Sequence, residues 1–142
     1  MALALAASDA EDPFTGLWKL NFQKSKIPPP VPRSETLRIA ADTKTISITL
    51  ERITDKGEPV KVTVNGGFDA KYYGVLASPF VYTVWFRRLD SHPIIAKALK
   101  SGTEIETGTA VVSKNGKTLT VKFSIAQSEG QEIKARAVYD KQ

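Results

Sequence analysis

The sequence offers few side chains that could carry out acid–base chemistry. His92 is its one histidine, and histidine is the side chain type best suited to general-base work near neutral pH. His92 follows Asp90 and Ser91, but consecutive residues cannot converge as nucleophile, base and orienting acid. A cofactor-free hydrolase or isomerase would therefore depend on His92, or on a carboxylate tuned by its surroundings, with Glu104 and Glu106 as candidates.

A second group of residues could hold a ligand without reacting with it. The stretch "FVYTVWFRRL" (80–89) predicts a strand that places Tyr82, Val84 and Phe86 on one face. Arg88 continues that face and would set one cation at the end of an apolar wall, which suits the head of an amphipathic anion. Tyr72 and its neighbour Tyr73 are expected to line the mouth of the same site or to pack beneath the loop. The opposite face is also apolar, so it is either covered or available for forming a homodimer.

Composition excludes several classes of site. Cysteine is absent, which removes disulfides, thiol catalysis and thiolate metal sites, and a single histidine cannot build a His-rich metal centre. The net charge is +5, but the cations are scattered without a long basic run, which argues against a nucleic-acid partner. We therefore expect no metal, no cofactor and no nucleic acid.

The first residues differ in character from the rest. "MALALAA" resembles the tail of an export signal and is too short to span a membrane. We expect residues 1–12 to be a flexible tail or signal-peptide remnant, and residues 13–142 to form one domain. A trimmed export signal would place the protein in the periplasm or outside the cell.

Alternation of apolar and polar residues dominates from Phe14 onward and predicts an all-β protein. The proline-rich "SKIPPPVPRS" (25–34) must be an extended loop. Residues 91–102 fit a helix or a strand equally well. Short turns without a βαβ rhythm predict an antiparallel up-and-down barrel of about eight to ten strands. The expected strands cover 14–22, 35–40, 45–53, 60–67, 71–73, 80–89, 103–113, 118–126 and 132–140.

The opening "FTGLWKL" and the closing "RAVYDK" resemble the first and last strands of the calycins, the group of lipocalins, fatty-acid-binding proteins and avidins. The chain as a whole is similar to small lipocalin-like bacterial proteins. The resemblance implies a ligand-binding barrel in which Gly16 and Trp18 lie near a closed end and Arg136 lies across the Trp18 ring. Fatty-acid-binding proteins hold a carboxylate with an inward Arg and Tyr two residues apart. Here Arg136 and Tyr139 are three apart, so they fall on opposite faces and the clamp is not carried over.

Three functions are compatible with this sequence. The first is non-covalent binding of a small hydrophobic or amphipathic molecule, such as a fatty acyl compound, inside the barrel. The second is turnover of an acyl ester or lactone in the same cavity. The third is a structural or interaction module of the cell envelope, present as a monomer or a homodimer.

Overall fold

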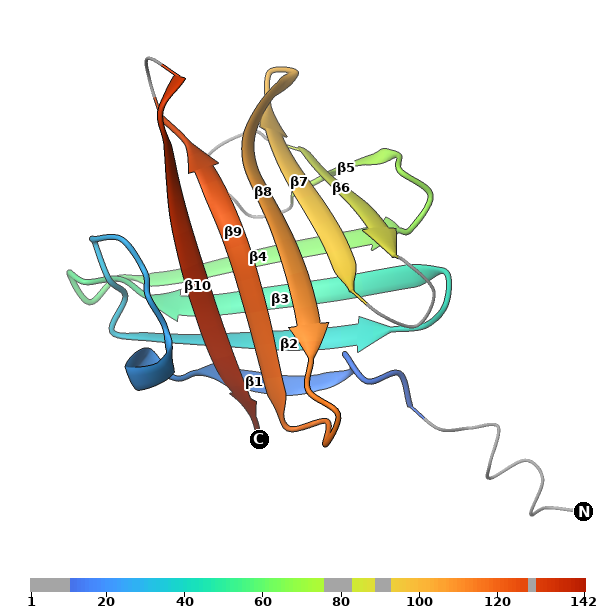
Figure 1. The fold of residues 1–142 in the computed structure, drawn as a ribbon, viewed down its shortest axis with the longest axis horizontal. Coiled ribbons are helices and arrows are strands. Elements are labelled where there is room, and N and C mark those ends of the chain that lie inside the picture. The colour runs from blue at the N-terminus through green and yellow to red at the C-terminus, as the bar shows by residue number, and fades with distance from the viewer. Residues whose placement is uncertain (1–10, 76–82, 89–92, 128–129) are drawn as a thin grey trace, which may run out of the picture.

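In the computed structural model the chain forms one antiparallel sheet of ten strands that curls into a nearly closed barrel (Figure 1). The structure describes residues 11–75, 83–88, 93–127 and 130–142. The strands are β1 (Gly16–Leu20), β2 (Ser34–Ala41), β3 (Thr45–Ile53), β4 (Pro59–Gly67), β5 (Tyr72–Gly74), β6 (Thr83–Arg88), β7 (Ile94–Lys100), β8 (Thr103–Val112), β9 (Thr118–Ala126) and β10 (Glu132–Lys141). The predicted all-β, up-and-down barrel is confirmed.

Each strand pairs with its neighbour in the chain, and β1 also pairs with β10. The two sheet edges, β4 and β5, come together without a hydrogen-bonded ladder between them. In Figure 1, β2–β4 run across the back of the molecule while β8–β10 stand upright in front of them. The inner faces of these two layers enclose the barrel interior, as is usual for a strongly twisted sheet folded onto itself.

The connections follow the local chemistry of the chain. Asn115 and Gly116 lie in the tight turn between β8 and β9, and Gly116 has a φ of 75° that favours glycine. The proline-rich loop links the short 3-10 helix η1 (Phe22–Lys24) to β2, and Lys26 within it forms an isolated bridge with Arg136. No helix in the described part of the chain has the length and apolar character needed to cross a membrane.

The segment that fitted helix and strand equally well is strand β7. Ile94 lies opposite Arg88 of β6 and Ala110 of β8, so β7 completes the ladder between its two neighbours. Ladder hydrogen bonds on both sides outweigh the helix propensity of the Ala- and Lys-rich stretch. This register turns Ile94 and Ala96 toward the interior, where Ile94 is buried.

Candidate functional site

One end of the barrel is closed by large apolar side chains. Trp18 is fully buried and its indole N–H donates to the backbone oxygen of Phe14 at 2.9 Å. Phe14 lies just before β1, where its buried ring adds to the closure. Residues of four other strands complete this end of the core, namely Ile39, Ile46, Ile94 and Leu119.

The cation over the Trp18 ring is Lys141, not Arg136. Lys141 pairs directly with Trp18 in the β1–β10 ladder, and its Nζ lies 5.6 Å from the ring centroid. Arg136 is exposed on the outer face, where its Nε donates to the Lys24 carbonyl at 3.3 Å. Strand alternation explains the difference, because Ala137 and Tyr139 occupy the inner face of β10. The expectation that Arg136 and Tyr139 point to opposite faces is confirmed.

The backbone conformation of Gly16 and its lack of a side chain contribute to the closed end. Its φ is 148°, a conformation that favours glycine. A Cβ at this position would come within 2.8 Å of Lys141 Cε. The absence of a side chain therefore lets the Lys141 side chain pass beside β1 to reach Trp18.

Arg88 also belongs to the closed end, which corrects its predicted role as a free cation for a ligand head. Its side chain is 4% exposed and forms two hydrogen bonds with the carboxylate of Asp12, which is 10% exposed. The guanidinium lies 5.2 Å from the Phe14 ring centroid and 5.5 Å from that of Phe68. A positive charge that is already neutralised and enclosed between two rings stabilises the barrel end and is not available to an anionic ligand.

The other predicted ligand residues divide between the two faces of the sheet. Val84 and Phe86 point inward, as the alternation predicted, and Phe86 is buried. Tyr72 is 62% exposed on the outer face opposite Trp85, so its expected place at the cavity mouth is wrong. Its neighbour Tyr73 takes the inward position. Tyr82 and His92 lie outside the described residues.

The opposite end of the barrel carries a polar cluster on its inner face. Glu35 of β2 lies directly across the ladder from Arg52 of β3, and both Nε and Nη2 of Arg52 lie 2.6 Å from Glu35 Oε1. The hydroxyl of Tyr139 donates to the other carboxylate oxygen, Oε2. Glu35 is 5% exposed, whereas Arg52 is 42% exposed. The cluster therefore leads from the buried interior to solvent, and we refer to this end of the barrel as the open end.

Glu106 of β8 completes this cluster. It pairs with the inward-facing Ala98 and Ile125 and lies close enough to Arg52 and Glu35 to feel both charges. Burial raises the pKa of the Glu106 carboxyl above its ordinary value, the Arg52 charge opposes this, and the Glu35 charge adds to it. In the described part of the chain, the carboxyl group of Glu106 makes no hydrogen bond or ion pair.

A β-bulge separates Glu106 from Glu104, although the two residues are only two apart. The register between β7 and β8 shifts at Ala98 and Leu99, which sends Glu104 to the outer face. There Glu104 accepts a hydrogen bond from Thr107 and lies 3.7 Å from the ammonium of Lys97. Of the two carboxylates that the sequence suggested, only Glu106 therefore belongs to the interior.

Burial also raises the pKa of Tyr139 well above its ordinary value, and the neighbouring Glu35 carboxylate adds to the effect. Tyr139 thus stays protonated, and its hydroxyl donates a hydrogen bond to Glu35. Sequence reasoning placed Tyr139 correctly on the face opposite Arg136 but did not find its partners, which lie on β2 and β3. Nothing in the local pattern around Glu35 or Arg52 marks them as a pair.

Between the closed end and the polar cluster, the inner face is apolar and several of its side chains are only partly buried. Side chains in the middle of this face keep some exposure to solvent, whereas those near Trp18 have none or nearly none. An inward-facing side chain stays accessible only where space remains beside it. The partly exposed inner-face residues are Ile48, Leu50, Val84, Val121 and Phe123.

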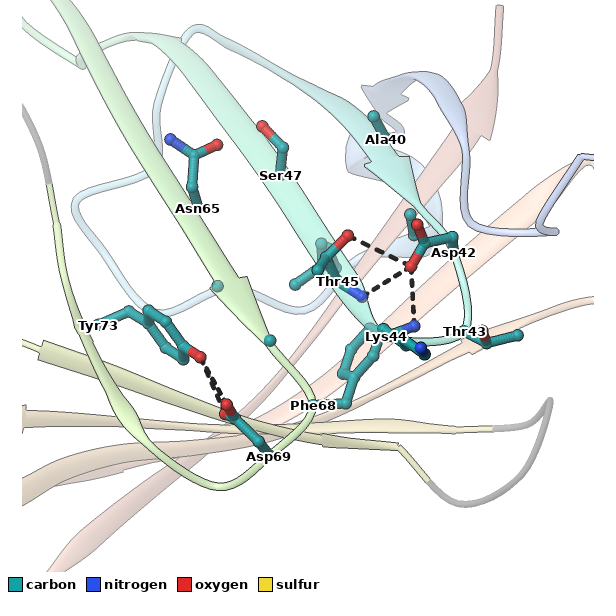
Figure 2. A pocket seen from close by; sticks show the side chains of 14 residues that line it. Ala40, Asp42, Thr43, Lys44, Thr45, Ser47, Asn65, Phe68, Asp69 and Tyr73 are labelled. Atoms are coloured by element: carbon teal, nitrogen blue, oxygen red, sulfur yellow. Dashed lines mark hydrogen bonds between the residues drawn. The ribbon is translucent and has the colours of Figure 1, made fainter.

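Two surface hollows lie away from the polar cluster, and neither is lined by its four residues. The larger, about 920 Å³, lies around the β2–β3 turn and the segment between β4 and β5. Figure 2 shows that its acids are already engaged: Asp42 accepts from the backbone N–H groups of Lys44 and Thr45, and Asp69 accepts from the Tyr73 hydroxyl. These contacts lower the pKa of each carboxyl, chiefly through the Lys44 N–H for Asp42 and the Tyr73 hydroxyl for Asp69. The acids therefore stabilise two turns.

The smaller hollow, about 520 Å³, lies on the outer face of β8–β10. Thr107, Thr109 and Ser124 line it together with four cations. Lys122 lies directly opposite Arg136 in the ladder, and such a like-charge pair costs stability. The four cations are Lys26, Lys122, Lys134 and Arg136.

No group of three or more acidic or histidine side chains in the described residues is placed to hold a metal ion. No protein-family model matches the chain. No curated protein matches it. Among solved structures, a de novo designed fluorescence-activating β-barrel is similar at 15% identity and a TM-score of 0.44, over 94% of this chain and 98% of that one. The candidate site therefore rests on the residues of this chain: an apolar interior, closed at the Trp18 end, with Glu35, Arg52, Glu106 and Tyr139 at the open end.

Proposed function

We propose that this protein binds a small amphipathic molecule in the barrel interior. The observation that carries the proposal is the inner face itself, on which partly exposed apolar side chains lead up to a half-buried polar cluster. Binding sites for small molecules are usually concave and mostly apolar, with a few polar groups that fix orientation. The tail of the molecule would lie toward Leu50 and Val84, and its polar head would meet the cluster at the open end.

Two other features fit a binding role. The closed end is stabilised by Trp18, Lys141 and the Arg88–Asp12 pair, so a ligand would enter from the end that carries the polar cluster. Tyr139 and Arg52 hold Glu35 from two sides, which keeps the head-group region rigid before a ligand arrives. A preformed site avoids part of the entropy cost of binding.

The test uses a neutral polarity-sensitive dye such as Nile red, whose emission rises when it leaves water. Ala96 lies on the inner face between Phe86 and Gly108, so Ala96→Phe would occupy the interior. The matched control is Ile95→Phe, because Ile95 is the next residue of β7 and points to the outer face. We expect wild type and the control to bind the dye and Ala96→Phe to lose most of that binding.

Ala96→Leu provides a smaller obstruction, and melting temperatures show which variants fold. A folded Ala96→Leu or Ala96→Phe protein that binds the dye as well as the Ile95→Phe control would overturn the proposal. Absence of dye binding by wild type would overturn it as well.

A second function is favoured by one observation. Burial raises the pKa of Glu106 inside the same interior, and a raised pKa makes a carboxylate a stronger proton acceptor. A cofactor-free hydrolase or isomerase acting on an ester or lactone would use Glu106 as its base. Glu106→Gln would then abolish turnover of such a substrate while the Glu104→Gln control, altered on the outer face, retains it.

A further inference from the structure

The polar cluster at the open end has an uneven balance of charge. Its described members are the two carboxyl groups of Glu35 and Glu106, the guanidinium of Arg52 and the neutral phenol of Tyr139. Among the other described cations on the inner face, Arg88 and Lys141 lie at the closed end against Asp12 and Trp18, and Lys100 lies two residues beyond Ala98 at the exposed end of β7. Within this four-residue cluster, the acids outnumber the cations by one.

Arg52, the cation of this cluster, is already paired with Glu35. Both Nε and Nη2 of Arg52 point at Glu35 Oε1, and the Tyr139 hydroxyl donates to Glu35 Oε2. Glu35 thus uses both carboxylate oxygens within the protein. Charge-assisted hydrogen bonds of this kind are the strong ones, so a ligand would gain little by breaking them.

The carboxyl group of Glu106 still has hydrogen-bond acceptors that a ligand could use. Its side chain faces the same interior, and among the described residues its carboxyl group makes no hydrogen bond or ion pair. A carboxylate presents acceptors only, so the atom that satisfies it must be a donor. A protonated amine supplies both the donors and the missing positive charge. A carboxylate head would instead lie beside two acids, and Arg52, the cation of this cluster, is already paired with Glu35.

Resting on the proposed function, we propose that the barrel selects amphipathic molecules with a cationic amine head, which Glu106 binds, over those with a carboxylate head. The aliphatic tail lies along Leu50, Val84 and Phe123, on the part of the inner face where the side chains are only partly buried. This differs from the fatty acyl ligand that the sequence suggested, because that ligand needed Arg88 free.

The experiment compares three compounds with the same ten-carbon chain, decylamine, 1-decanol and decanoate, as competitors of Nile red at pH 7 and below their aggregation limits. We expect decylamine to bind about tenfold more tightly than decanol, the factor typical of one charge-assisted hydrogen bond. Decanoate should bind more weakly than decanol. Glu106→Gln should remove the advantage of the amine and leave decanol within about twofold.

Glu104→Gln is the matched control, since Glu104 is two residues away on the outer face, and it should leave all three affinities unchanged. If wild type does not bind the dye, the proposed function fails. If the dye binds but decanoate competes as well as decylamine, the proposed function stands and the amine preference is refuted. Retention of the amine advantage in Glu106→Gln would likewise refute the role of Glu106.

Discussion

The Arg88–Asp12 pair tests whether the closed end of the barrel depends on one buried ion pair. Both side chains are nearly inaccessible, at 4% and 10%, and the guanidinium lies between the rings of Phe14 and Phe68. Asp12→Asn keeps the size of the side chain and removes its charge. The buried guanidinium then keeps its hydrogen bond to the Asp42 carbonyl but loses its counter-charge.

Removing one partner of a buried pair costs about 3–5 kcal/mol, because the remaining charge stays out of water. We expect Asp12→Asn to fall near the lower figure, since the Asp42 contact remains. At roughly 3 °C per kcal/mol for a chain of this size, the melting temperature should fall by about 10 °C. The double variant Arg88→Met with Asp12→Asn removes the stranded charge and places an apolar side chain between the two rings, so it should lie within about 1 kcal/mol of wild type.

The assay is equilibrium unfolding in urea, followed by tryptophan fluorescence and by circular dichroism, for wild type, both single variants and the double variant. Glu51→Gln is the control, because Glu51 and Lys61 form an exposed pair 4.0 Å apart that should contribute less than about 0.5 kcal/mol. A loss below about 0.5 kcal/mol in Asp12→Asn, or a double variant whose loss equals the sum of the two single losses, would refute the reasoning.

Three further predictions concern other parts of the barrel. Trp18→Phe should destabilise the protein by about 1–3 kcal/mol in urea unfolding, since it removes buried volume and the donor to the Phe14 carbonyl; no change would show that this end tolerates a gap. Burial raises the pKa of Glu106 above its ordinary 4.5, so the folded state binds that proton more tightly than the unfolded state. Glu106→Gln should therefore be more stable than wild type at pH 7, and the difference should shrink as the pH falls toward 4.5; a constant difference in melts across that range contradicts the assignment. Lys122→Glu turns the like-charge pair with Arg136 into an attractive one and should raise the unfolding free energy by about 0.3–1 kcal/mol at low salt, an increase that must vanish in high salt.

The strand pattern could be predicted from the sequence because side-chain direction alternates strictly along an extended backbone. That rule placed Val84, Phe86 and Arg88 on one face, and it also separated Arg136 from Tyr139. It failed at Glu104 and Glu106, where a bulge inserts an extra residue and breaks the alternation. A bulge depends on how β7 and β8 pair, and no local feature of "TEIET" indicates it.

The chemical partners of the key side chains could not be predicted in the same way. Asp12 is 76 positions from Arg88, and Glu35 is 104 positions from Tyr139. Such contacts depend on register and on how the sheet curls, and a shift of one residue would turn each side chain to the other face. The resemblance to calycins led to Arg136 as the cation over Trp18, whereas register brings Lys141 there.

The sequence by itself determined an all-β chain, the apolar faces of its strands and the position of Trp18 on an inward face, because these follow from backbone periodicity and residue type. Only the tertiary structure decided which end of the barrel closes and which charges face the interior. Closing the sheet brings Arg88 to Asp12 at one end and leaves Glu106 beside the Glu35–Arg52 pair at the other. These contacts form between strands far apart in the chain, and they are what give the interior its candidate chemistry.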